Sequence, residues 1–535
     1  MVCKTVLCSI LGINLYNIQI LSSAKYSLLS DKNRIRVNIL QPLRGIIFDR
    51  NGETLVNNAF TYSAVVDSEK DITDIVMIEL QDICGEISNS NTILCTNLTW
   101  NEVIQLESNL KINQIVKIHQ SYKRVYIYKE LLSYITGYVG IPSKSDKKKN
   151  FLIGKNGLEM QFDEQLQGTP GVQKVEVNAI GKIIREISND SGTQGNAIKT
   201  SIDLRLQKKL YEINESRRGI YIAMKVHTGE ILGMYSTPGY DPNLFTNGIR
   251  TQDWQEIMSD PDKPMINRSI SSLYPPGSTF KMITLLAILN SGISPTESVF
   301  CTGEHKIGTR VLHCWKKTGH GHINAYNALE HSCNIYFAVF GMKVGIAAIT
   351  EIASVFGLGN KTNIELPFEV SGLIPTKDWK MQKYKKVWTF GDTVNVSIGQ
   401  GYTLTTPLQL VVMTARIAIG RKITPTILCS DNSFSSIKEI KSEHLEIIRK
   451  SMFNVMKNHH WENLKIAGKT GTAQVISKRD ATGKFGDHSL FLGFAPYDAP
   501  QYAVLSIVEN AGWGSENALP ITKQIFRYLF ELNII

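Results

Sequence analysis

The chain has 535 residues, of which 43% are hydrophobic and 20% are charged, so it is long enough for two or three domains with substantial cores. Its formal net charge is +10, but no dense run of Lys and Arg accompanies this charge, and we therefore expect no nucleic-acid partner. We interpret the positive net charge as a weak preference for anionic lipid or polymer surfaces.

The N-terminus is an apolar segment. Residues Thr5–Leu21 contain no Asp, Glu, Lys or Arg, and their length is at the short limit for a membrane span. Ser22–Ala24 could mark a cleavage site, so the alternatives are an uncleaved signal-anchor, a cleaved signal peptide and a buried helix. We favour a signal-anchor transmembrane helix over residues 1–24.

Residues 25–200 are predicted to form one elongated, strand-rich module without a catalytic site of its own. A strand through 44–52 ends at an Asn-Gly turn, and a short strand follows at 61–66. Residues 70–135 read as helical with loops. A helix is expected at 157–166, and a hairpin is expected from 172–177 and 180–186.

Residues 201–535 are predicted to form a second domain of α+β class. Asp203 can cap a helix that runs to about 215, and a hairpin is expected over 220–236. Apolar helices are expected at 282–289, 335–342 and 520–532, and a second hairpin at 490–508. Strands near both ends of the domain, with helices between them, indicate an antiparallel sheet flanked by helices.

Ser278 and Lys281 stand three residues apart, directly after Tyr274-Pro-Pro-Gly277 and before an apolar helix. This spacing places the ammonium beside the hydroxyl. A serine hydroxyl is a weak nucleophile until a neighbouring base takes its proton, and a lysine can be that base when its pKa is lowered. The alternative is a capped helix with a solvated lysine.

Two further short motifs follow in the chain. Ser332-Cys333-Asn334 precedes an apolar helix, and Lys469-Thr470-Gly471-Thr472 is expected to open a strand at 473–476. Each motif alone is weak. S-x-x-K, S-x-N and K-T-G in this order and at these separations are together a strong signal of serine acyl transfer.

The motif set resembles the penicillin-binding protein and serine β-lactamase superfamily. Arg44-Gly-Ile-Ile-Phe-Asp-Arg-Asn-Gly52, Asp241-Pro-Asn243 and Gly399-Gln-Gly-Tyr402 are similar to class B transpeptidases. Leu15-Tyr-Asn-Ile-Gln19, Gly319-His-Gly321 and Gly391-Asp392 are similar to penicillin-binding protein 2, the elongation branch. The resemblance implies the transpeptidase fold for 201–535 and a non-catalytic pedestal or dimerisation-type module for 25–200.

The resemblance also implies a role for each motif residue. Ser278 would attack a D-Ala-D-Ala peptide and form an acyl-enzyme, and Lys281 would accept its proton. Ser332 would relay a proton to the leaving nitrogen, and Asn334 would bind the peptide group of the substrate. Lys469, Thr470 and Thr472 would bind the terminal carboxylate, while Gly471 would leave room for substrate along the strand edge. The N–H groups of Ser278 and Thr472 would form the oxyanion hole.

A cluster of cysteines and histidines separates the first two motifs. Cys301, Cys314, His320 and Cys333 could hold tetrahedral structural Zn²⁺, although their spacing is not that of a standard zinc finger. The family resemblance supports zinc and favours His320 over the rival ligands His313 and His322. A disulfide with one free thiol, or three buried free cysteines, are the alternatives. Cys84 and Cys95 could pair in an oxidising compartment.

The function implied by the resemblance is peptidoglycan D,D-transpeptidase activity in cell-wall elongation, with acylation by β-lactams. A D,D-carboxypeptidase and a β-lactam-binding sensor or scaffold are the alternatives. The implied partners are stem peptides, the lipid-linked precursor, elongation-complex proteins and a SEDS-type glycosyltransferase, since 25–200 shows no polymerising motif. The implied location is a bacterial inner membrane, with a single span and a periplasmic catalytic domain.

Overall fold

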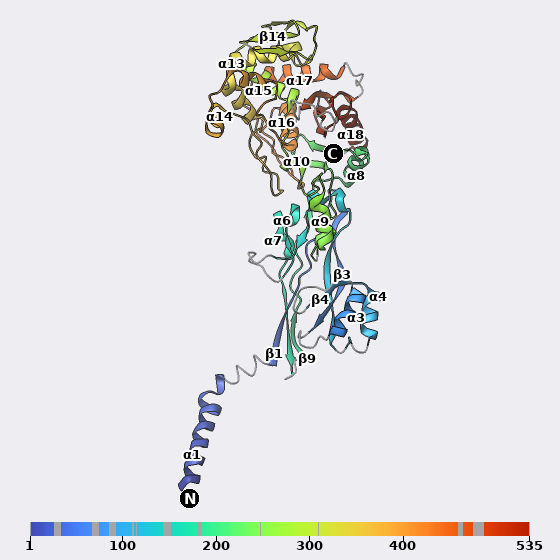
Figure 1. Cartoon of the computed structure of the whole chain (residues 1–535), viewed down its shortest axis with the longest axis vertical. Helices are drawn as coiled ribbons and strands as arrows, with labels where there is room; N and C mark the ends of the chain where they lie inside the picture. The colour runs from blue at the N-terminus through green and yellow to red at the C-terminus, as the bar shows by residue number, and fades with distance from the viewer. Residues whose placement is uncertain are drawn as a thin grey trace.

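The computed structural model describes most of the chain. The described residues are 2–25, 34–66, 74–84, 93–109, 112–113, 115–142, 151–178, 183–246, 248–308, 310–457, 464–473 and 486–533. The molecule is elongated, with the N-terminal helix at one end, a strand-rich module in the middle and the C-terminal domain at the other end (Figure 1).

The N-terminal helix α1 (Val2–Tyr16) continues as a π-helical turn over Asn17–Leu21. The large apolar side chains that the structure describes here are more than half exposed, at Val6 and from Ile10 to Leu21. The helix therefore presents an apolar surface against which no part of the described chain is packed.

The described part of the N-terminal module contains two larger sheets and the two-stranded sheet of β6 (Val139–Gly140) and β7 (Ile153–Gly154). Strands β10 (Ile198–Lys199), β2 (Ile47–Phe48), β3 (Thr54–Val66) and β4 (Ile93–Leu98) form one sheet in that order, and β5 (Val116–Tyr126) also pairs with β3. Strands β1 (Ile35–Leu40), β8 (Gly171–Val177) and β9 (Ile183–Asp190) form an antiparallel three-stranded sheet. The helices of the module are α3 (Asp74–Cys84), α4 (Trp100–Ser108), α5 (Ser133–Thr136), α6 (Gly157–Gln161) and α7 (Asp163–Gln167).

The expectations for this module need four corrections. The strand expected through 44–52 is only the two-residue β2. The strand expected at 61–66 begins at Thr54, and the region expected to be helical contains β4 and the long strand β5. The helix expected at 157–166 is two short helices, because Phe162 leaves helical geometry between them. The predicted hairpin is formed by β8 and β9, although 179–182 lie outside the described residues. A disulfide joins Cys84 to Cys95.

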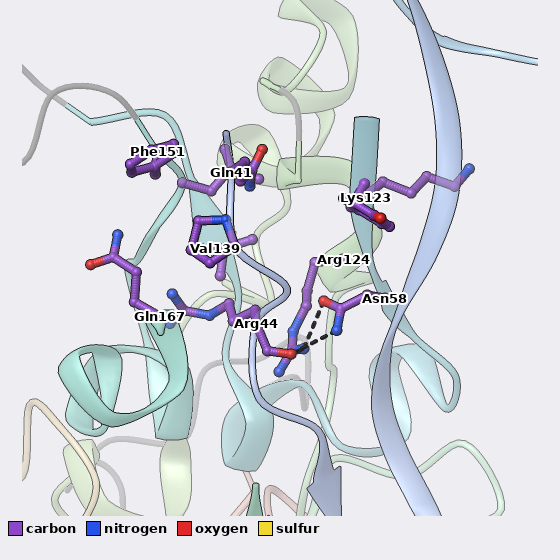
Figure 2. Close-up of a pocket in the computed structure, with 11 residues that line it drawn as sticks. Gln41, Arg44, Asn58, Lys123, Arg124, Val139, Phe151 and Gln167 are labelled. Carbon is purple, nitrogen blue, oxygen red and sulfur yellow. Dashed lines mark hydrogen bonds between the residues drawn. The ribbon is translucent and has the colours of Figure 1, made fainter. Parts of the chain in front are cut away.

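A buried polar cluster ties the segments of this module together. Glu159 is fully buried and accepts hydrogen bonds from Arg44 at 2.5 Å and from Arg124 at 2.6 Å. Figure 2 shows Arg124 reaching the Arg44 carbonyl and the Asn58 side chain, beside a cavity of about 20 Å³. Burial alone would raise the pKa of Glu159, but the Arg124 and Arg44 guanidiniums hold it below its usual value.

The C-terminal domain is built on a five-stranded antiparallel sheet. The strand order is β12 (Ile231–Ser236), β11 (Gly219–Lys225), β19 (Tyr502–Val508), β18 (His488–Ala495) and β17 (Ala467–Ala473). The two predicted hairpins are thus neighbours in one sheet, with β17 at its edge. This arrangement confirms the predicted α+β class.

Helices cover both faces of this sheet, because alternate residues of its strands point to opposite sides. One face packs against α8 (Leu204–Asn214) and α18 (Ala518–Leu532). The other packs against α16 (Pro407–Ile419) and α17 (Ser442–Lys457), and α11 (Lys281–Asn290) and α13 (Asn334–Val355) belong to the same apolar core. Asp203 caps α8 as predicted, because its carboxylate accepts hydrogen bonds from the backbone N–H groups of Arg205 and Leu206. The helices α9 (Thr251–Ser259), α14 (Lys377–Tyr384) and α15 (Phe390–Ser397) complete the domain.

Helix α13 extends well beyond the predicted 335–342. It has the length and hydropathy of a membrane span, but half of its apolar window is buried inside the domain, so we assign it to the core. Its backbone leaves helical geometry at Gly345, where φ is 79°. The shorter apolar segment Cys8–Leu21 lies at the N-terminus.

A small insert of four strands lies between α11 and α13. Strand β13 (Val299–Cys301) pairs with β16 (Gly321–Ile323), and β14 (Glu304–Ile307) pairs with β15 (Arg310–His313). The insert forms the end of the molecule that is farthest from α1 (Figure 1). It carries three members of the cysteine and histidine cluster.

Candidate active site

Ser278 lies in a single 3₁₀ turn, Gly277–Phe280, that runs directly into α11. The two prolines and Gly277 end the preceding segment, and Lys281 becomes the first residue of the α-helix. Gly277 has φ of +54°, and a Cβ at this position would lie 2.6 Å from the Thr472 carbonyl oxygen. Glycine is therefore required for the turn Gly277–Phe280, the nucleophile turn, to approach β17.

Lys281 is fully buried and its ammonium contacts the second motif. Its Nζ donates hydrogen bonds to Ser332 Oγ at 3.1 Å, to the Ser332 carbonyl at 2.9 Å and to Asn334 Oδ1 at 2.7 Å. Burial, followed by the positive charge of Lys469, lowers the pKa of Lys281 to about 7. A substantial fraction of Lys281 is therefore neutral at neutral pH, as a general base requires.

The third motif lies inside the edge strand β17. The expectation that Lys469 opens a strand at 473–476 is wrong in its bounds, because β17 begins at Ala467 and pairs with β18 through Ala473. Residues 474–476 lie outside the described part of the chain. Lys469 is only 2% exposed, and burial lowers its pKa to about 8.

Packing also explains why residue 471 is a glycine, in addition to the expected need for space beside the substrate. A Cβ at this position would lie 2.9 Å from Thr279 Cγ2 and 3.3 Å from the Pro276 carbonyl oxygen. The strand and the nucleophile turn are thus in contact at Gly471, and the absence of a side chain sets their separation.

Ser332 and Asn334 flank the start of α13. Ser332 has φ of +51°, an unfavourable backbone region for a serine that is often found at functional sites. Asn334 is the first residue of the helix, and its Nδ2 donates to the His313 carbonyl at 3.2 Å. Cys333 between them is buried. The S-x-N segment therefore faces Lys281 on one side and the insert on the other.

One cavity of about 470 Å³ joins the three motifs. Its lining includes most of the predicted site residues, namely Ser278, Ser332, Asn334, Lys469, Thr470, Gly471 and Thr472. Lys281 lies behind it and reaches it through Ser332 and Asn334.

The sequence did not single out several other residues that line this cavity. They are Trp315, Glu330, His331, Ile398, Val455, Asp487, Trp513, Gly514 and Ser515, whereas Gln400, which also lines the cavity, belongs to the Gly399-Gln-Gly-Tyr402 motif. All except Val455 in α17 lie in loops, so no periodic pattern marks them. The one available signal was Gly512-Trp513-Gly514, in which a large aromatic residue stands between two glycines just after a predicted strand.

The cysteine and histidine cluster gathers as predicted. The Sγ atoms of Cys301, Cys314 and Cys333 and one ring nitrogen of His320 all lie within 4.8 Å of one another. His320 Nδ1 is 3.6 Å from Cys301 Sγ and 3.5 Å from Cys314 Sγ. His313 and His322 are exposed and point elsewhere, toward Glu304 and Phe300 respectively. The three cysteines are free thiols, so the disulfide alternative is not formed in this structure.

Three comparisons with known proteins agree. The Penicillin binding protein transpeptidase domain matches residues 219–530, and the Penicillin-binding Protein dimerisation domain matches residues 39–200. The peptidoglycan D,D-transpeptidase MrdA of Haemophilus influenzae is 32% identical over 581 residues, which cover 98% of this chain and 89% of that protein.

Solved structures are also similar over nearly the whole length. Penicillin-binding protein PBP2 of Helicobacter pylori, in its complex with MreC, superposes with a TM-score of 0.83 at 28% identity, covering 94% of this chain and all of that one. A chain of a peptidoglycan synthase complex that coordinates polymerization and crosslinking superposes with a TM-score of 0.74 at 26% identity, covering 98% and 96%.

Proposed function

Because this chain belongs to the penicillin-binding protein transpeptidase family, in its penicillin-binding protein 2 branch, we propose that it is a serine D,D-transpeptidase that cross-links peptidoglycan stem peptides during cell-wall elongation. One observation carries the proposal. The three short motifs, far apart in sequence, line a single cavity around Ser278, with a buried lysine of lowered pKa hydrogen-bonded behind it.

In the proposed mechanism each residue has one step. Neutral Lys281 takes the Ser278 proton, and Ser278 Oγ forms an ester with the penultimate D-Ala carbonyl. Lys281 then returns the proton through Ser332, to which it is hydrogen-bonded, and the terminal D-Ala leaves as the amine. Lys469, Thr470 and Thr472 bind the terminal carboxylate from the strand edge, and the Ser278 and Thr472 N–H groups stabilise the oxyanion. A β-lactam follows the same first step.

A D,D-carboxypeptidase or a β-lactam-binding sensor would share this cavity. The relatives that match nearly the whole chain are named transpeptidases, and the strand-rich module that they share with it is unnecessary for simple hydrolysis. Neither alternative is therefore favoured.

The cysteine and histidine cluster is proposed to bind one structural zinc ion. Tetrahedral Zn²⁺ with thiolate and imidazole ligands places the ligand atoms about 3.3–3.8 Å apart, and the two sulfur-to-nitrogen distances of 3.5 and 3.6 Å fit this range. Zinc would supply structural stability only. Cys333 would then hold the backbone between Ser332 and Asn334.

The zinc proposal is tested on purified protein. We expect one zinc per chain, its loss in a Cys301→Ser/Cys314→Ser variant, and slower penicillin acylation after chelation. Protein without zinc and with Cys301 disulfide-bonded to Cys314 would contradict the proposal, as would chelated protein that keeps its full acylation rate.

The proposed setting is a bacterial inner membrane, with α1 as a single-span anchor and the catalytic domain in the periplasm. The exposed apolar surface of α1 supports this assignment. The relatives solved with MreC and within a peptidoglycan synthase complex support elongation-complex partners. We extend this to a SEDS-type glycosyltransferase that supplies the glycan strand, and to the lipid-linked precursor as a source of stem peptides.

The core of the proposal is tested with a labelled penicillin. Wild-type protein should become covalently labelled, and Ser278→Ala should abolish labelling. Ser291→Ala is a matched control, because Ser291 caps the other end of α11 through the Ala287 carbonyl. Labelling of Ser278→Ala equal to wild type would refute the nucleophile assignment. Cross-linked product from lipid-linked precursor and a polymerase would separate a transpeptidase from the alternatives.

A further inference from the structure

Each side of the catalytic cavity carries one exposed indole and one carboxylate. On the Ser332 side, Trp315 and Glu330 line the cavity, and the Trp315 Nε1–H donates to the His331 carbonyl at 2.9 Å. On the β17 side, Trp513 and Asp487 line it, and the segment is fixed by the Gly512 N–H, which donates to the Asp487 carbonyl at 2.8 Å. The two indole residues are 57% and 60% exposed.

Exposed indoles in a cavity with a nucleophile are suited to contact a substrate, because tryptophan gives a large apolar face and interacts favourably with cations. Trp315 is held rigidly for such a role. Its ring lies 5.4 Å from that of His320, which stacks in turn on His331 at 5.9 Å. The indole thus keeps one orientation while one of its faces remains accessible.

The Glu330 carboxylate is uncompensated. Within the described parts of the chain, no hydrogen bond or ion pair to this carboxylate is formed, and the residue is only half-buried. It stands two residues before Ser332 in the loop between α12 (Ala325–Ala328) and α13. A carboxylate that lines the cavity and has no partner of its own is available for a cation brought by a ligand.

Transpeptidation requires such a cation. The acyl acceptor is a primary amine of a second stem peptide, and it reaches the active site mainly as an ammonium. It must attack the acyl carbon from the side that the first amine left, where Ser332 relays protons. The Ser332 side of the cavity, and not the β17 side that holds the donor carboxylate, is therefore the side on which the acceptor nitrogen arrives.

From this we propose that Glu330 and the Trp315 indole form the binding subsite for the acceptor ammonium. This inference rests on the proposed transpeptidase function and deepens it. The subsite takes an aliphatic primary amine, whose charge meets the Glu330 carboxylate and whose methylene groups lie on the indole.

The reaction through this subsite balances as follows. The ammonium held by Glu330 loses one proton to solvent and becomes a free amine. Its lone pair attacks the acyl carbon, the bond between this carbon and Ser278 Oγ breaks, and an amide bond forms. A second proton from the nitrogen passes through Ser332 and Lys281 to Ser278 Oγ, which restores the free hydroxyl. Glu330 binds the amine and takes no part in these transfers.

The test measures how the acyl-enzyme divides between amine and water. Full-length protein is acylated by a thioester donor, and aminolysis by a synthetic stem peptide with one free side-chain amine is compared with hydrolysis. Glu330→Gln should lower the aminolysis-to-hydrolysis ratio at least about tenfold at low amine concentration, since a charge-assisted contact is lost. Hydrolysis and labelling by penicillin should stay within about twofold of wild type.

Further variants sharpen the result. Trp315→Leu should lower the same ratio, while Trp315→Phe keeps a ring and should recover part of it. Glu351→Gln, which removes an exposed carboxylate of α13 that does not line the catalytic cavity, is the matched control for charge loss. An unchanged ratio in Glu330→Gln would overturn the proposal, and so would an equal or larger fall in Asp487→Asn. Wild-type protein that is not acylated at all would instead contradict the proposed function.

Discussion

Two buried lysines within one site make the protonation state of each residue a condition for activity. In the proposed mechanism, Lys281 must be neutral to accept the Ser278 proton, and Lys469 must be charged to bind a carboxylate. Burial sets both pKa values, and the positive charge of Lys469 lowers that of Lys281 further. With values of about 7 and about 8, the two requirements overlap only in a narrow range.

We therefore predict a bell-shaped pH profile for acylation by benzylpenicillin. The rate should rise about tenfold per pH unit below pH 7, because Lys281 loses its proton there, and should fall above pH 8 as Lys469 loses its charge. Stopped-flow acylation across pH 5.5 to about 9.5 measures it. Lys469→Gln should move the acidic limb to higher pH, and an acidic limb that stays in place would show that Lys469 does not lower the pKa of Lys281.

Between elements, the contact of β17 with the nucleophile turn sets the active-site spacing. We predict that Gly471→Ala slows acylation about tenfold or more, because its Cβ would press on Thr279 Cγ2 and displace the turn. The free energy of unfolding should fall by about 1–3 kcal/mol. Thr279→Ser removes the closest atom and can keep the hydrogen bond from the 279 hydroxyl to the Pro276 carbonyl. The double variant should therefore recover much of the rate, and recovery no better than in Gly471→Ala would locate the effect elsewhere.

Helices and strands whose apolar residues follow a clear period were predictable from the sequence. Strands that form only by pairing with residues far along the chain were not. The hairpin of β11 and β12 followed from its turn, and α8 followed from Asp203. Strand β5 was missed because Lys117, Gln120 and Lys123 occupy its outer positions and the charged Arg124 occupies a buried one, so its apolar residues are too sparse to mark an alternation. The motif residues were predictable because their types, order and separations resemble those of a known family. Trp315 and Glu330 were not, because only the folded insert brings them to the cavity.

Across the whole molecule, the cluster around Glu159 joins segments from β1 to α7 into one module. We predict that Glu159→Gln lowers the stability of this module by about 3–5 kcal/mol at pH 7, because the buried Arg124 loses its ion pair and Arg44 keeps only Asp163. The pKa of Glu159 is lowered in the folded state, so its contribution is present above the unfolded value of about 4.3 and is lost as the pH falls.

Chemical unfolding followed at pH 7 and at acid pH measures this difference. Glu176→Gln is the matched control, because Glu176 also has two arginine partners, Arg34 and Arg185, but these are 53% and 71% exposed. The control should change stability far less. Equal losses of stability in the two variants would show that burial does not increase the contribution of Glu159 to stability.

The doubly held amide of Asn334 has a directional consequence. Its oxygen accepts from Lys281 and its nitrogen donates to the His313 carbonyl, so the amide cannot rotate without breaking both bonds. An amide has one more lone pair and one more N–H to offer, and their positions are now fixed. A peptide that binds this amide must therefore present its own carbonyl and N–H in one order. The same peptide in the opposite direction would place its N–H against the Asn334 N–H and its carbonyl against the Asn334 oxygen. The polarity of the chain that is cross-linked is thus selected before Ser278 reacts.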